Sequence, residues 1–178
     1  MLNQQRSPKL GTLSIIGSAK NPLDIISVDT VGGFEGYESN QKYLHLAIDH
    51  FTRFLWGCTS KTQKSFYFRK LLRLVFSIGK PEILLSDNYP GIVSKDFRFF
   101  LQQSKIELKL VPPHHPKSNS MIERANQTLT DRIRCKFYEH ENETAWPILA
   151  HRSIREYNNT LHSTTGYSPV QFPLNWSF

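Results

Sequence analysis

The sequence predicts an α/β fold, a five-stranded mixed sheet flanked by helices. Two observations support this prediction. Five short segments either alternate apolar and polar residues or are rich in β-branched residues, as strands are. Between and after the later of these strand segments, apolar residues recur at the spacing of amphipathic helices. The resulting order is three strands, helix, strand, helix, strand and then helices, which favours helices packed against a mixed sheet.

The composition is that of one folded domain with a basic balance of charge. At 178 residues the chain is long enough for a sizeable core but short for two full domains. Hydrophobic residues make up 39% and aromatic residues 12%, which is typical of a folded rather than a disordered chain. The 22 Lys and Arg against 15 Asp and Glu give a formal net charge of +7. This excess favours an anionic partner such as nucleic acid.

Two absences narrow the class of protein. The two cysteines, Cys58 and Cys135, lie far apart, and no group of Cys and His has the spacing of a zinc site. A reducing intracellular compartment is therefore expected. The sequence shows neither a signal peptide nor an apolar run approaching ~20 residues. We therefore expect a protein that is not secreted and has no membrane partner.

The first three strands are expected after an N-terminal tail. Residues 1–20 are polar and basic, and we interpret them as a tail or linker, so that the folded domain occupies 21–178. Leu23–Val31 is rich in β-branched residues and is followed by two glycines, as a buried strand often is. Tyr43–Ile48 and Arg53–Thr59, joined by a short polar segment, predict an antiparallel hairpin.

Helices and strands then alternate. Thr62 is the predicted N-cap of a helix, and Ile83–Leu85 is a short strand after it. Ser94 is the predicted cap of the next helix, and Ile106–Leu110 alternates as the fifth strand. The first of these helices has an apolar face made of Phe68, Leu71, Leu72, Val75 and Ile78.

A long helix is expected over Ser120–Tyr138, and a last one over Thr144–Tyr157. At ~100° per residue, Glu123 lies about a quarter-turn from the apolar stripe of the long helix. It is therefore expected beside the buried face without being part of it. The apolar stripe consists of Ile122, Ala125, Leu129 and Ile133.

Three acidic residues are candidates for a metal site. Asp29 lies near the end of the first strand, Asp87 follows the fourth, and Glu123 lies in the first turn of the long helix. The 35 residues from 88 to 122 suffice for one helix, one strand and a loop. Two divalent ions ~3.5–4 Å apart can activate the attacking oxygen and stabilise the leaving oxygen of phosphoryl transfer, and a few carboxylates suffice for Mg²⁺. We expect these acids to hold divalent metal for chemistry on a nucleic-acid backbone.

Each acid also has a purely structural interpretation. Asp29 could cap a turn at the end of its strand, and Asp87 could belong to an ordinary turn. Ser120 and Glu123 have the spacing of a capping box, in which each side chain bonds the other residue's backbone amide. Local sequence alone favours this cap for Glu123.

The acids lie in segments that resemble a known family. SVDTVG, LLSDN and HPKSNSMIERANQTL, in this order and spacing, are similar to the catalytic core of retroviral and retrotransposon integrases. The terminal YNNTLHSTTGYSP resembles the end of that core in the Ty3/Gypsy group. The resemblance covers roughly residues 23–172.

The resemblance implies an RNase H-like fold with Asp29, Asp87 and Glu123 as catalytic metal ligands. The implied cofactor is Mg²⁺ or Mn²⁺. The implied activity is that of an integrase, a nucleotidyltransferase and endonuclease that removes nucleotides from the 3′ ends of element DNA and then joins those ends to target DNA. The implied partners are DNA and further copies of the chain, in a homodimer or a higher multimer. A nuclear location with a cytoplasmic nucleoprotein stage is expected.

The resemblance also implies DNA contacts around Glu123. Relatives commonly have Gly where Tyr89 follows Asp87-Asn88, and lysines where this helix has Gln127 and Thr130. The basic residues that could replace those lysines, or be ordinary solvated charges, are Arg124, Arg132, Arg134 and Lys136. The residues that correspond to DNA contacts in the family are His114, Lys117, Ser118, Asn119 and Asn126, to which we add Arg124.

Three other interpretations stay open from the sequence. The core of an insertion-sequence transposase uses the same three acids. A domesticated derivative would bind DNA or a protein without catalysis. A plain interaction domain would make the spacing of the acids a coincidence.

Overall fold

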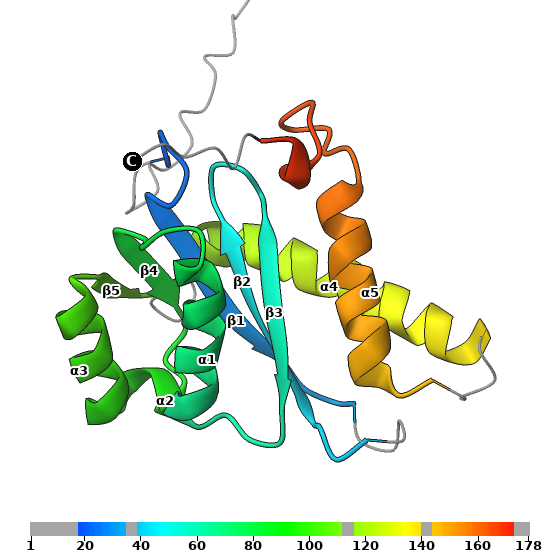
Figure 1. Cartoon of the computed structure of the whole chain (residues 1–178), viewed down its shortest axis with the longest axis horizontal. Coiled ribbons are helices and arrows are strands. Elements are labelled where there is room, and N and C mark those ends of the chain that lie inside the picture. The colour runs from blue at the N-terminus through cyan, green and yellow to red at the C-terminus, as the bar shows by residue number, and fades with distance from the viewer. Residues whose placement is uncertain (1–17, 35–38, 112–115, 140–143, 173–178) are drawn as a thin grey trace, which may run out of the picture.

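The computed structural model describes residues 18–34, 39–111, 116–139 and 144–172. Its centre is one sheet with the strand order β3-β2-β1-β4-β5 (Figure 1). β1 pairs antiparallel with β2, and β2 with β3, whereas β1–β4 and β4–β5 are parallel. The prediction of a five-stranded mixed sheet is confirmed. The strands are β1 (Ile25–Val31), β2 (Tyr43–Asp49), β3 (Leu55–Ser60), β4 (Ile83–Ser86) and β5 (Glu107–Leu110).

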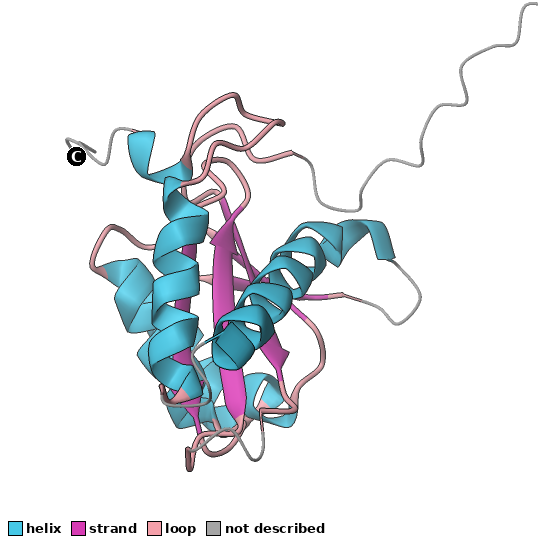
Figure 2. Cartoon of the chain, turned by 90° about the vertical axis from the view of Figure 1, so that its right-hand side faces the viewer, coloured by secondary structure: helices cyan, strands magenta, loops and turns pink. Residues whose placement is uncertain are grey.

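Helices cover both faces of the sheet. One face carries α1 and α3, and the other carries α4 and α5, which lie in front of the strands in Figure 2. None of the helices in the described ranges is long and apolar enough to cross a membrane. The helices are α1 (Ser65–Phe76), α2 (Pro90–Val93), α3 (Lys95–Ser104), α4 (Pro116–Glu139), α5 (Trp146–Asn159) and the 3₁₀ helix η1 (Pro169–Gln171).

Two hydrophobic cores follow from the alternation along the strands. In β2, Leu44, Leu46 and Ile48 point to the core under α4 and α5, whereas Ala47 belongs to the core under α1 and α3. Successive side chains of a strand point to opposite faces, so one strand serves both layers. The predicted apolar faces of the helices are buried in these cores, among them Phe68, Leu71, Leu72 and Val75 in α1 and Ile122, Ala125, Leu129 and Ile133 in α4.

The boundaries predicted at the start of α1 and at the start of β3 are wrong. Thr62 does not cap α1, because the helix begins at Ser65 and Lys64 occupies the N-cap position. The Thr62 carbonyl instead accepts a hydrogen bond from the Ser60 hydroxyl at 2.8 Å, within the turn that leaves β3. Arg53 is outside β3, because its φ of 67° is left-handed and places it in the hairpin turn. The predicted Ser94 cap is confirmed by a 3.3 Å bond from the Phe97 amide.

Asp49 has a structural role at the hairpin. It was not among the acids predicted to bind metal. It is fully buried at the end of β2. Its carboxylate accepts hydrogen bonds from the Leu23 amide at 3.1 Å, the Thr52 amide at 2.9 Å and the Thr52 hydroxyl at 2.6 Å. Burial raises the pKa of this carboxyl, and the hydrogen bonds oppose that shift. Asp49 thus holds the β2–β3 turn.

The C-terminal helix is joined to β3 by a pair of buried hydrogen bonds. Asn158 accepts from the Leu55 amide at 2.9 Å and donates to the Leu55 carbonyl at 2.8 Å. One side-chain amide thereby satisfies both polar groups of a buried backbone residue. The segment YNNTL, whose resemblance to retroelement cores was noted from sequence, therefore has a structural function at Asn158.

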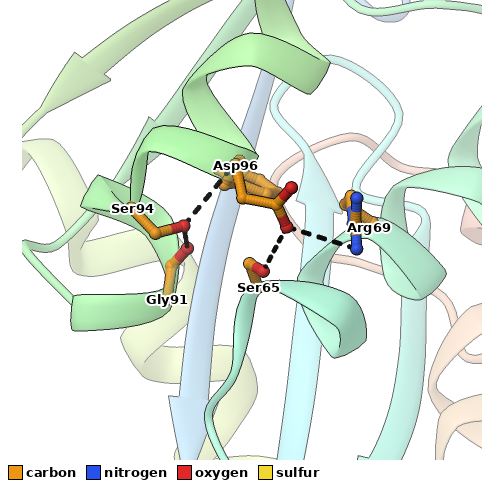
Figure 3. A network of polar contacts seen from close by, with 6 residues as sticks. Ser65, Arg69, Gly91, Ser94 and Asp96 are labelled. Atoms are coloured by element: carbon orange, nitrogen blue, oxygen red, sulfur yellow. Dashed lines mark hydrogen bonds and ion pairs between the residues drawn. The ribbon is translucent and has the colours of Figure 1, made fainter.

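A polar network fixes the segment that follows β4 (Figure 3). The Asp96 carboxylate accepts from the Ser65 hydroxyl at 2.9 Å and pairs with Arg69 at 3.3 Å, which links α3 to α1. The Ser94 hydroxyl donates to the Gly91 carbonyl at 2.8 Å. A Cβ at Gly91 would lie 2.3 Å from the Gln63 carbonyl oxygen, so only glycine permits this approach of α2 to the start of α1.

Candidate active site

Two of the three predicted acids lie at the same end of the sheet, near the carboxyl-terminal ends of the inner strands β1 and β4. β1 and β4 are parallel and in register at Val28 and Ser86, so Asp29, within β1, and Asp87, directly after β4, are the next residues of the two segments. Their carboxyl-terminal ends reach the same edge. The charge of Asp87 contributes to raising the pKa of Asp29, as expected for two carboxylates at the same end of the sheet.

The Asp29 carboxylate is buried and held by donors from three elements. It is only 9% exposed. Oδ1 accepts from its neighbour's amide, Thr30 N, at 2.7 Å and from the Tyr89 hydroxyl at 2.6 Å. Oδ2 accepts from the Asn126 side-chain amide. Burial raises the pKa of Asp29 above its ordinary value, and the three hydrogen bonds reduce that shift. A divalent cation would relieve both the desolvation and the repulsion from Asp87.

Tyr89 contacts the Asp29 carboxylate, a contact that no pattern in the sequence indicated. Its position after Asp87-Asn88 was interpreted only as turn chemistry and as a departure from the family pattern. In the structure its amide donates to the Asp87 carbonyl at 2.9 Å, and its ring stacks near Phe68 with centroids 6.2 Å apart. Burial and the charge of Asp29 raise the pKa of the hydroxyl, which therefore stays a donor.

The capping-box interpretation of Ser120 and Glu123 is wrong. α4 begins at Pro116, so Ser120 lies one turn inside the helix rather than at its N-cap. Its carbonyl accepts from the Arg124 side chain, Nε, at 3.0 Å. A capping box requires the first residue to precede the helix, so this role is not available to Glu123.

Glu123 lies on the exposed side of α4, next to the residue that contacts Asp29. A cavity of about 330 Å³ runs along this side of the helix, and Glu123 and Asn126 both line it. Asn126, one turn later, connects this cavity to the Asp29 carboxylate. Among the side chains that the structure describes, no three His, Cys, Asp or Glu are close enough to hold a metal ion together. That Glu123 is the third metal ligand stays a prediction. The remaining lining residues are Gln127, Thr130, Asp131 and Arg134.

The predicted DNA contacts are only partly covered by the structure. His114 lies outside the described residues. Lys117, Ser118 and Asn119 fall within α4, but their side chains are outside the described part. Arg124 is exposed on α4. Asn126 is half-buried and contacts Asp29, which makes it a partner of the acid pair rather than a free surface amide.

The donors at this edge fit a small, hard divalent cation. Mg²⁺ prefers oxygen ligands and is commonly held by one or two carboxylates while it keeps several waters. Asp29 provides one such carboxylate from β1, and Asp87 provides a second directly after β4. No sulfur or imidazole ligand is placed with them among the described side chains. The chemistry of these two carboxylates therefore fits a divalent cation such as Mg²⁺ or Mn²⁺.

Comparison with known proteins shows the family of the chain. The family model described as "Integrase core domain" matches residues 19–116, more than half of the chain, and includes Asp29 and Asp87. The Transposon Tf2-3 polyprotein of Schizosaccharomyces pombe is 26% identical over 182 residues, which is 99% of this chain. The chain spans 13% of the length of that relative, so the whole polyprotein's activities are not shown for it.

Solved structures show the same fold. The HTLV-2 integrase catalytic core domain in complex with magnesium has a TM-score of 0.71 at 18% identity, with 84% of this chain and 95% of that one covered. A chain of the simian T-cell lymphotropic virus intasome in complex with a PP2A regulatory subunit has a TM-score of 0.79 at 19% identity, with 95% and 59% covered. The predicted RNase H-like fold is confirmed.

Proposed function

Since the chain belongs to the integrase core domain family, we propose that it is a metal-dependent polynucleotidyl transferase that trims the 3′ ends of element DNA and joins them to target DNA. The observation that carries the proposal is the pairing of Asp29 and Asp87 at the ends of two parallel strands. Two carboxylates in this position are the oxygen ligands that phosphoryl-transfer sites use.

Each residue of the site has one proposed role. Asp29 and Asp87 hold the divalent cation, and Glu123 completes the site from α4. When bound, the metal lowers the pKa of the attacking oxygen and neutralises charge on the phosphate. Asn126 and Tyr89 keep the Asp29 carboxylate in one orientation. Because Asp29 lies in β1, Asp87 directly follows β4 and Glu123 lies in α4, we expect little reorganisation during the reaction.

The reaction itself tests this proposal. Short duplexes that mimic an element end should be cleaved near their 3′ ends and joined to a second duplex in the presence of Mg²⁺ or Mn²⁺. Chelation with EDTA should stop both reactions, and added Mg²⁺ should restore them. DNA binding without cleavage or joining, in either metal, would instead support a domesticated, non-catalytic derivative.

DNA binding should depend steeply on salt. Arg124, Arg132 and Arg134 lie on α4, the last of them in the same cavity lining as Glu123. If these three neutralise three phosphates, raising salt from about 50 to 200 mM should weaken binding roughly 40-fold, since the logarithmic slope is about −0.9 per contact. Fluorescence anisotropy with a labelled duplex measures this dependence.

A matched pair of variants locates the contacts. Arg134→Ala should reduce the magnitude of the salt slope by about 0.9. Arg73→Ala, on the exposed side of α1 at the opposite face of the sheet, should leave it unchanged. Equal effects of the two substitutions, or a flat salt response of the wild type, would contradict a DNA-binding face on α4.

We also propose that the protein acts as a homodimer or a larger multimer, in the nucleus, with a cytoplasmic nucleoprotein stage. Joining two ends of one element requires two sites held together. The structural neighbours include dimeric and trimeric forms of the HTLV-2 core. Exposed apolar side chains on the outer helices, Phe66 and Leu74 on α1 and Ile148 on α5, are available for such contacts.

A further inference from the structure

We propose that Tyr89 is a positioning residue that leaves Asp29 a single free acceptor position, on Oδ2, and so makes the site selective for Mg²⁺ over larger cations such as Ca²⁺. This inference rests on the proposed metal site and goes beyond it by naming what sets the metal preference.

The hydrogen bonds of Asp29 determine which oxygen remains free. A carboxylate offers about four acceptor positions, two on each oxygen. On Oδ1 both are used, one by the Thr30 amide at 2.7 Å and one by the Tyr89 hydroxyl at 2.6 Å. On Oδ2 the Asn126 amide uses one. Counting the donors among the described residues, one position is left, so Asp29 can bind a cation through one oxygen only.

The Tyr89 hydroxyl is held in place from several sides. Its ring belongs to the edge of the core under α1, near Phe68. Its backbone amide bonds the Asp87 carbonyl at 2.9 Å, so the same short turn carries one acid and holds the other. Two residues further on, Gly91 packs against the start of α1 without room for a side chain. The hydroxyl therefore cannot leave Oδ1 without displacing packed groups.

Single-oxygen binding discriminates between cations. Mg²⁺ demands a nearly octahedral shell at about 2.0–2.1 Å and keeps most of its waters, whereas Ca²⁺ accepts six to eight oxygens and often both oxygens of one carboxylate. Removing the Tyr89 hydroxyl frees a position on Oδ1. Asp29 then offers one free position on each oxygen and can chelate, which favours Ca²⁺.

Metal binding without DNA tests this proposal directly. Binding of Mn²⁺ to the chain is measured by electron paramagnetic resonance, and Mg²⁺ or Ca²⁺ is titrated in as a competitor. Tyr89→Phe should lower the ratio of the Ca²⁺ to the Mg²⁺ dissociation constant about fivefold, the effect of one hydrogen bond. Tyr138→Phe, at a residue of α4 that is 71% exposed, is the matched control and should leave the ratio unchanged.

Each outcome decides a different question. An unchanged ratio in Tyr89→Phe, or a loss of affinity that is equal for both competitors, would overturn the role of Tyr89, since a merely structural effect weakens all cations alike. Thermal melting of the variant checks that the fold is intact. If Asp29→Asn does not reduce Mn²⁺ binding, the proposed metal site itself fails and the selectivity proposal with it. If Asp29→Asn abolishes binding and the Tyr89→Phe ratio is unchanged, only the selectivity proposal fails.

Discussion

Replacing Asp87 with Asn should lower the rate of Mg²⁺-dependent DNA joining by about 10³-fold or more, because a metal ligand supports several kcal/mol of transition-state stabilisation. The fold should persist, since Asp87 is half-exposed at the end of β4 and Asn has the same shape. Asp29 would also lose the neighbouring charge that raises its pKa. Joining of labelled duplexes, measured at saturating Mg²⁺, gives the rate.

Glu82→Gln is the matched control for this substitution. Glu82 is an exposed acid just before β4, at the end of the strand opposite to Asp87, so its loss changes the net charge equally without touching the site. It should retain wild-type joining. Unchanged joining in Asp87→Asn would remove this residue from the catalytic site and leave Asp29 without its partner.

Truncating Trp146 should have the largest effect on stability. Its indole is fully buried at the start of α5 and stacks on Phe34 with centroids 4.2 Å apart. The indole N–H donates to the Gln41 carbonyl at 3.1 Å. Trp146→Ala opens a cavity and leaves that carbonyl unpaired, so the free energy of unfolding should fall by about 3–5 kcal/mol. Urea denaturation followed by circular dichroism measures this quantity.

Trp146→Phe separates the two contributions. An aromatic ring still stacks on Phe34, while the hydrogen bond and part of the buried volume are lost, so the expected decrease is smaller, about 1–2 kcal/mol. A decrease of under about 1 kcal/mol for Trp146→Ala would contradict the packing described here. Because α5 packs against α4, the alanine variant should also weaken the placement of Glu123 and Asn126.

The acids themselves could be found from sequence, but their relation to one another could not. Asp29 and Asp87 were identifiable because each follows or lies near the end of an apolar run, and strand ends lie at sheet edges. Glu123 was ambiguous: a three-residue spacing to Ser120 satisfies the local rule for a cap equally well. The start of α4 at Pro116, four residues earlier than Ser120, decides against the cap.

Local patterns in the chain encode the strands, the helices and their order, since side-chain direction follows from backbone geometry within a few residues. The alternation in β2 and the stripe Ile122, Ala125, Leu129 and Ile133 were readable for that reason. Contacts between residues far apart in sequence could not be predicted, because they depend on how whole helices and strands pack. The bonds of Asp29 to Tyr89 and Asn126 span 60 and 97 positions, and only the folded chain brings these side chains together.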